Sequence, residues 1–211
     1  YFSNIWKIYV LSLLCIFFLP ACVSPEPSRT GRRAEPSVKV QLQGFSKWQR
    51  VCDSETALPS FKGAQADVAD SSLAEGWEKL FNSVRSAPDV EKMRAVNIFF
   101  NQFPYKEDME VWGIEDHWAT PRQFMQQGGD CEDYAIAKYF ALRELGVGID
   151  AMRIAGVWNK KQGRGHAVLL VQAGQNTWVL DNLNDKPVLQ RDLPHYLPQY
   201  YANENHIWRK P

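Results

Sequence analysis

Residues 128–134 read Gly128-Gly129-Asp130-Cys131-Glu132-Asp133-Tyr134 and stand directly before the clearest helical pattern in the chain. The apolar stripe of that pattern consists of Ile136, Ala137, Phe140, Ala141 and Leu145, and Gly146 follows as a stop signal. Asp130 is placed to cap the helix, and Asp133 is placed to reach back, as in an acidic capping box. The stretch therefore predicts a helix that carries the Cys131 thiol in its first turn.

Strand-like segments follow this helix, and two of them carry polar side chains suited to activate a thiol. The segments are 151–158, 166–172 and 177–182, and the last two read as a hairpin. A two-residue turn at Ala173-Gly174 would place His166 directly opposite Asp181. Cys131, His166 and Asp181 thus have the order of a nucleophile, its base and the residue that orients the base. His117, beside Asp116, is the competing base.

A helix N-terminus and a neighbouring imidazolium both lower the pKa of a thiol, and the thiolate is the nucleophile. Such a site performs acyl transfer through an acyl-enzyme, with backbone N–H groups of the first turn as part of an oxyanion hole. Water as the acceptor gives a peptidase, whereas an amine gives a transglutaminase or amidase. A catalytically inactive binding module is the non-enzymatic alternative.

Carboxylates crowd the same thiol, and like charges oppose its ionisation. Asp130, Glu132 and Asp133 flank Cys131 in the sequence, and Asn182 follows the triad aspartate with an amide oxygen. Calcium prefers oxygen ligands in loose geometry, so these four residues are the candidate ligands of a Ca²⁺ ion. A capped and solvated acidic turn without a metal is the other interpretation.

The chain has 211 residues and a formal net charge of zero, so its charge gives no case for nucleic-acid binding. Residues 1–22 resemble a secretory signal, with an apolar run after Lys7. The run ends at Cys22, where lipidation would add a membrane anchor; an uncleaved N-terminal anchor is the alternative. Residues 23–70 are expected to form a flexible tether and N-terminal extension, and 71–211 the catalytic domain.

Two cysteines, Cys52 and Cys131, follow the expected signal segment. They are either joined by a disulfide or free thiols, and the two interpretations exclude each other. Cys52 falls in a stretch that resembles a loop, and a disulfide between Cys52 and Cys131 would abolish the proposed nucleophile. We therefore expect Cys52 to be a partly buried structural thiol.

Upstream of the cysteine-bearing helix, apolar residues at helical spacing predict two helices. They are Leu73, Trp77, Leu80, Phe81 and Val84, then Val90, Met93, Val96, Phe99, Phe100 and Phe103. A further short helix starts at Thr120-Pro121.

Four blocks of sequence together resemble the bacterial transglutaminase-like cysteine peptidases. They are Trp118-Ala119-Thr120-Pro121, the run from Gly128 to Tyr139, Gly165-His166-Ala167-Val168-Leu169 and Val179-Leu180-Asp181-Asn182-Leu183. The resemblance covers roughly residues 70–210. It implies an α+β fold with a papain-like, transglutaminase-like core, in which N-terminal helices and the cysteine-bearing helix pack on an antiparallel sheet.

The resemblance also implies a function. Members of the family are calcium-dependent periplasmic proteases that cut the N-terminal region of a large surface adhesin near paired alanines, which releases biofilm cells. Carried over by position, Cys131 is the nucleophile, His166 the base and Asp181 the orienting residue, while Asp130 and Glu132 are the acidic pair that needs calcium. An inner-membrane receptor for cyclic di-GMP is the implied inhibitory partner.

Overall fold

The computed structural model describes residues 45–57 and 71–209, which all belong to one compact unit, Glu35–Pro211. The expected signal segment 1–22 and most of the expected tether 23–70 lie outside the described residues. Within the described ranges, no helix is both long and apolar enough to cross a membrane.

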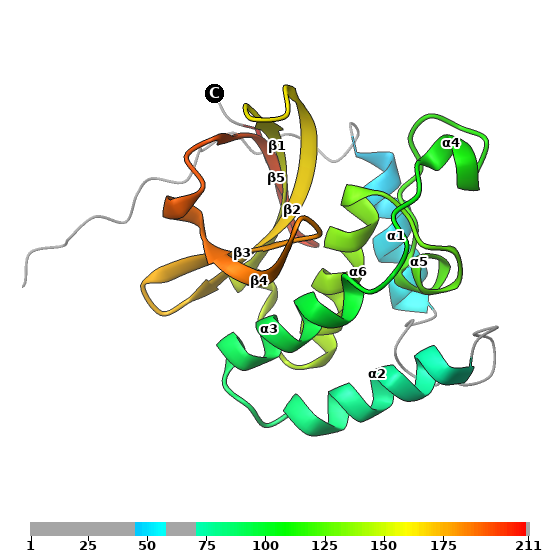
Figure 1. The fold of residues 1–211 in the computed structure, drawn as a ribbon, viewed down its shortest axis with the longest axis vertical. Helices are drawn as coiled ribbons and strands as arrows, with labels where there is room; N and C mark the ends of the chain where they lie inside the picture. Colours follow the sequence, from blue (N-terminus) through cyan, green and yellow to red (C-terminus); the bar gives the residue numbers. More distant parts are fainter. Residues whose placement is uncertain (1–44, 58–70, 210–211) are drawn as a thin grey trace, which may run out of the picture. The chain divides into compact units, whose positions relative to one another are not determined.

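Six α-helices precede the sheet in the described part of the chain (Figure 1). They are α1 (Ser46–Ala57), α2 (Ser71–Val84), α3 (Asp89–Phe100), α4 (Asp108–Val111), α5 (Pro121–Gln127) and α6 (Cys131–Glu144). The sequence predicts α2, α3, α5 and α6, and the structure confirms all four. Thr120 caps α5 as expected, since its side chain accepts a hydrogen bond from the Gln123 N–H at 3.3 Å.

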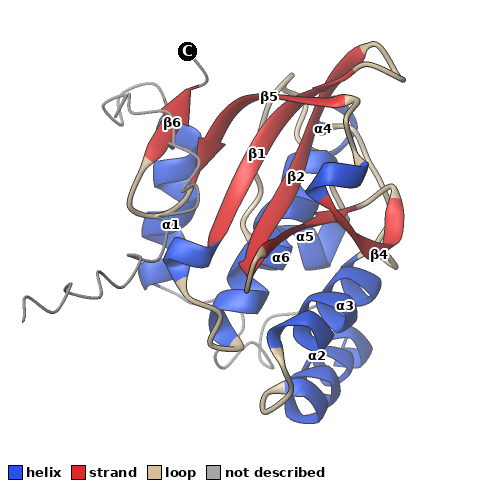
Figure 2. Ribbon diagram, turned by 90° about the vertical axis from the view of Figure 1, so that its left-hand side faces the viewer, coloured by secondary structure: helices blue, strands red, loops and turns tan. Residues whose placement is uncertain are grey.

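The strands form a single antiparallel sheet in the order β4-β3-β2-β1-β5-β6 (Figure 2). Their bounds are β1 (Met152–Asn159), β2 (Arg164–Ala173), β3 (Asn176–Asp181), β4 (Asn184–Leu189), β5 (Tyr196–Ala202) and β6 (Ile207–Arg209). Short 3-10 turns occur at Ile149–Ala151 and Gln190–Asp192. The expected α+β class and antiparallel sheet are confirmed.

The expected register of the β2–β3 hairpin is wrong by two residues. Ala173 pairs with Asn176, so the turn is Gly174-Gln175 rather than Ala173-Gly174. The observed pairing ends at Leu169 and Leu180. One residue further along both strands, Asp181 lies opposite Val168, so His166 is a diagonal neighbour of Asp181. Because strand side chains alternate with a period of two, a slip of two keeps both residues on one face.

The two faces of the sheet carry different apolar clusters. Ile154, Leu169 and Leu180 belong to the main core, which they share with the helices. Their neighbours in sequence, Ala155 and Val179 among them, form a smaller cluster with partly buried side chains that include Tyr196. The helix α6 crosses the core face and contacts β1, β2 and β3. His166 and Asp181 lie an even number of residues from the members of the smaller cluster on their own strands. Their side chains therefore belong to the same face of the sheet as that cluster.

Helix α1 corrects the expectation that Cys52 lies in a loop. Trp48 and Val51 are fully buried in the main core, and the Trp48 indole N–H donates to the Asn203 carbonyl at 2.9 Å. Tertiary packing thus stabilises a segment whose apolar periodicity is weak. Cys52 lies in this helix as a half-buried free thiol, and Cys131 is also free. Burial raises the pKa of the Cys52 thiol to about 12.

Strands β4, β5 and β6 are not expected from the sequence, because proline and charged residues interrupt them. Pro187 lies in β4, an edge strand, and Pro198 lies where the β1–β5 pairing shifts register between Gly156 and Val157. Edge strands and bulges are the places in a sheet that tolerate proline. The Tyr200 ring of β5 packs over Gly156 at the same irregularity.

Gly156→Ala should destabilise the protein by about 1–3 kcal/mol, because a Cβ at this position would clash with the Tyr200 ring and overpack the sheet. The free energy of unfolding in urea measures the effect. Gly148→Ala is the matched control, since a Cβ at residue 148 would have nothing within 4 Å of it. An alanine there should be neutral or stabilise by up to about 1 kcal/mol. Equal effects of the two substitutions would contradict the packing argument.

Candidate active site and acidic cluster

The start of α6 is fixed by Asp133, which is fully buried. Its carboxylate accepts hydrogen bonds from the Asp130 N–H at 3.3 Å and from the Ala119 N–H at 2.7 Å. Gly129 leaves room for this carboxylate, because a Cβ at residue 129 would clash with it. The predicted return bond from Asp133 is therefore confirmed, and it also ties the segment before α5 to the helix that carries the thiol.

Cys131 lies against an open edge of β2. Strand β3 pairs with β2 only from Leu169 onward, so within the described part of the chain the first residues of β2 have no strand on that side. Ala167 of this edge lines the same cavity as Cys131. Cys131 and His166 then line one cavity of about 480 Å³, together with Gly156, Trp158 and Tyr200. Trp158 is 44% exposed at this cavity.

His166 and Asp181 form the closest pair of the proposed triad. His166 Nε2 lies 2.9 Å from Asp181 Oδ1, and their side chains are only 2% and 1% exposed. Since Nε2 is engaged by Asp181, Nδ1 is the ring nitrogen available to the thiol. The hairpin therefore brings together the two residues that the sequence predicts, and the cavity adds the third.

Asp181 is held as a carboxylate by its hydrogen-bond donors. The Tyr196 hydroxyl donates to Oδ2 at 2.6 Å, and the Leu183 N–H donates to Oδ1 at 2.9 Å. Burial raises the pKa of Asp181, but these bonds and His166 outweigh it and hold the pKa below its ordinary value. Sequence patterns do not reveal Tyr196, because it lies on the unexpected strand β5.

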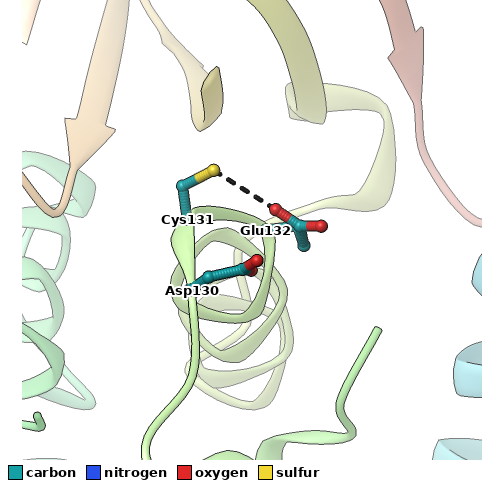
Figure 3. Close-up of side chains that lie close together, drawn as sticks. All are labelled: Asp130, Cys131 and Glu132. Atoms are coloured by element: carbon teal, nitrogen blue, oxygen red, sulfur yellow. Dashed lines mark hydrogen bonds between the residues drawn. The ribbon is translucent and has the colours of Figure 1, made fainter. Parts of the chain in front are cut away.

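Glu132 contacts the proposed nucleophile, Cys131, directly. Its Oε2 lies 3.2 Å from the Cys131 sulfur, and Figure 3 shows the two side chains converging at the end of the helix beside Asp130. Burial is the largest cause that raises the pKa of the Cys131 thiol, and the Glu132 and Asp130 carboxylates raise it further, well above its ordinary range. Burial and these carboxylates thus favour the unreactive thiol, as the acidic neighbours suggested.

More acids gather here than the sequence indicates. Two groups of three acids each have carboxylate oxygens within 4.8 Å of one another. One group is Asp108, Asp116 and Glu132, and the other is Asp108, Asp130 and Asp133. We call Asp108, Asp116, Asp130, Glu132 and Asp133 the acidic cluster. Lys47 of α1 forms an ion pair with Asp116. Asp108 and Asp116 lie some 15 to 25 residues before the cysteine, so no local motif marks them.

The acidic cluster fits a calcium ion. Asp130 Oδ1 and Asp108 Oδ1 are buried without a hydrogen-bond partner among the described residues, and buried carboxylate oxygens rarely stay unsatisfied. Burial and then Glu132 raise the pKa of Asp130. Oxygens bound to one Ca²⁺ at 2.3–2.6 Å lie at most about 5 Å apart, which matches the spacing here.

The fourth predicted ligand, Asn182, follows β3 beside Asp181. Its Oδ1 is buried without a hydrogen-bond partner among the described residues, and its role as a ligand stays a prediction. The competing base, His117, stacks on Trp112 with ring centroids 4.3 Å apart and does not line the cavity that holds Cys131. Of these two histidines, only His166 lines that cavity.

Comparisons with known proteins agree with this geometry. The chain matches the family model of the bacterial transglutaminase-like cysteine proteinases (BTLCP) over residues 75–210. Among solved structures it resembles Legionella pneumophila LapG, with 30% sequence identity, a TM-score of 0.61 and coverage of 75% of this chain and 87% of that one.

Two further structures of the same Legionella protein also match, both with a TM-score of 0.61. The EGTA-treated form shares 30% identity, covering 76% of this chain and 86% of LapG, and the calcium-bound form shares 29% with the same coverage. A search of curated proteins gave no match. On its matched length and its site geometry, the chain belongs to the family of bacterial transglutaminase-like cysteine proteinases.

Proposed function

We propose that this protein is a calcium-dependent cysteine endopeptidase whose substrate is the N-terminal region of a large surface adhesin, cut near paired alanines. The observation that carries the enzymatic part is the cavity that Cys131 shares with His166, whose imidazole is held by Asp181. Family membership supports the peptidase chemistry, and the adhesin substrate is what the resemblance of the sequence blocks implies.

The chemistry follows from the positions of the side chains. His166 Nδ1 takes the proton of Cys131, and the thiolate attacks the peptide carbonyl. Backbone N–H groups of the first turn of α6 stabilise the negative charge on the carbonyl oxygen. The His166 imidazolium then gives its proton to the leaving amine. Water activated by the neutral imidazole hydrolyses the acyl-enzyme, which restores the thiol.

The acidic cluster is proposed to hold Ca²⁺ through Asp130 and Glu132, with Asp108 and Asp116 as further oxygen donors. The ion would supply positive charge beside the thiol and lower the cost of its ionisation. Asp133 is committed to the backbone bonds that fix α6, so it serves this site chiefly as a support. The likeness to a calcium-bound LapG structure supports the choice of ion.

We further propose that the protein acts in the periplasm and that an inner-membrane receptor for cyclic di-GMP inhibits it. The basis is the apolar leader-like segment 1–22 and the family resemblance. Lipidation at Cys22 would attach the protein to a membrane. Release of biofilm cells by adhesin cleavage is the proposed biological outcome.

Cys131→Ala should lower cleavage of an alanine-rich adhesin fragment by at least about a thousandfold, because loss of a nucleophile removes the covalent route. Gel analysis and mass spectrometry of the fragments measure the effect, with circular dichroism to verify folding. Cys52→Ala is the matched control and should keep its activity. Cleavage that persists in Cys131→Ala would make Cys131 structural.

The same assay separates hydrolysis from amine transfer. With a primary amine such as cadaverine present, a hydrolase yields fragments whose masses sum to the substrate plus one water. A product that carries the amine would instead establish the transglutaminase or amidase alternative, and binding without any product would establish the inactive module.

Calcium should raise the thermal unfolding temperature, and EGTA should reverse the rise. At a free ion concentration of 100 times Kd, binding to the native state contributes about 2.7 kcal/mol. Glu132→Gln should abolish the shift, whereas Glu115→Gln, which alters an exposed acid outside the acidic cluster, should leave it intact. An unfolding temperature indifferent to calcium in the unsubstituted protein would remove the metal from the proposal.

A further inference from the structure

A lysine lies buried in the same helix that carries the nucleophile. Lys138 is fully buried in α6, seven residues after Cys131. Seven residues are almost two helical turns, so Lys138 lies on the same side of α6 as Cys131, about 10 Å along the axis. Taking an ammonium group out of water costs several kcal/mol, and an apolar side chain would fill the same space without that cost.

The ammonium group of Lys138 is held by a neutral partner. Its Nζ donates to Asn101 Oδ1 at 2.7 Å, and it lies 5.5 Å from the centre of the Tyr134 ring. Among the described residues, no carboxylate lies within ion-pair distance of it. The charged groups that act on Lys138 through space are Asp181 at the end of β3 and Asp185 on β4.

Asn101 connects this ammonium to the triad. Its Nδ2 donates to the backbone carbonyls of Asp181 and Asn184, each at 3.1 Å, which bracket the turn between β3 and β4. Asn97, one turn earlier in α3, donates to the same Asn184 carbonyl at 2.6 Å. The turn that carries Asp181 is therefore anchored to α3, and Lys138 orients the amide that anchors it.

We propose that Lys138 is a positioning residue for the triad, whose buried ammonium group fixes the Asp181 turn through Asn101 and so holds the Asp181 side chain facing His166. Asp181 is almost fully buried, and its hydrogen-bond partners His166, Tyr196 and the Leu183 N–H carry no permanent charge. The Lys138 ammonium places a positive charge near this carboxylate. This inference rests on the proposed role of Cys131 as the nucleophile.

The charge on Lys138 is itself sensitive to pH. Burial lowers the pKa of Lys138 to about 7, although Asp181 and Asp185 raise it in part. Below that pH the ammonium is present, and above it the charge is lost. Lys138→Met therefore removes a charge that matters most on the acid side of neutrality.

The test is the rate at which iodoacetamide alkylates Cys131 in the calcium-loaded protein, followed between pH 4 and 9 by mass spectrometry of the Cys131 peptide. In Lys138→Met the half-maximal rate should move up by on the order of one pH unit, the size expected for removing one charge at about 10 Å. Rates on the acid limb should fall about tenfold. The two profiles should converge above pH 7, where the lysine of the unsubstituted protein has lost its charge.

Two further variants separate charge from packing. Lys138→Gln keeps an N–H donor for Asn101 without the charge and should shift as Lys138→Met does. Lys92→Met removes a similarly buried lysine of α3, which pairs with Asp89 instead, and should leave the profile unchanged. Thermal unfolding of each variant verifies the fold.

The outcomes are distinct. A uniform loss of rate at all pH values in Lys138→Met, or an unshifted profile in Lys138→Gln, would overturn the inference and make Lys138 a packing residue. If Cys131 of the unsubstituted protein reacts no faster than Cys52, the proposed nucleophile fails instead, whatever the lysine variants do.

Discussion

The early end of the β2–β3 pairing is the constraint on which this site depends. Because the pairing stops at Leu169 and Leu180, the first residues of β2 keep an open edge. The capped start of α6 brings Cys131 to that edge, where it lines one cavity with Ala167 and His166. A longer hairpin would cover the edge with β3 and exclude the thiol. The same ending places Asp181 at the last position of β3, diagonal to His166.

The electrostatics of the site divide into two regions of opposite effect. On the triad side, hydrogen bonds hold the pKa of Asp181 below its ordinary value, so it remains an anion that accepts a hydrogen bond from the His166 ring. On the other side, burial with Glu132 and Asp130 disfavours the Cys131 thiolate. A cation in the acidic cluster would cancel the second effect without touching the first. The proposed cation would therefore couple to the ionisation of Cys131 through the 3.2 Å contact between Cys131 and Glu132.

The sequence predicts the parts of this site that local chemistry encodes. The cap at Asp130 and Asp133, the helix from Cys131 and the shared face of His166 and Asp181 follow from short-range patterns. The face is robust because a register error of two residues preserves it, although the predicted turn is misplaced. Asp108, Asp116 and Tyr196 cannot be predicted in the same way. They reach the site through tertiary packing, from a segment before α5 and from a strand interrupted by Pro198.

The buried ionisable groups near the thiol differ in how completely their hydrogen bonds are satisfied, and that difference separates their roles. Asp133 and Asp181 spend their oxygens on backbone and side-chain donors, and each holds one segment against another. Asp130 and Asp108 each keep a buried oxygen without a partner among the described residues. Buried carboxylate oxygens rarely stay unsatisfied, so these two are the oxygens of the cluster that remain available to the proposed cation. Asp133 and Asp181 therefore position the segments of the site, whereas Asp130 and Asp108 keep oxygens with which the proposed cation could bind.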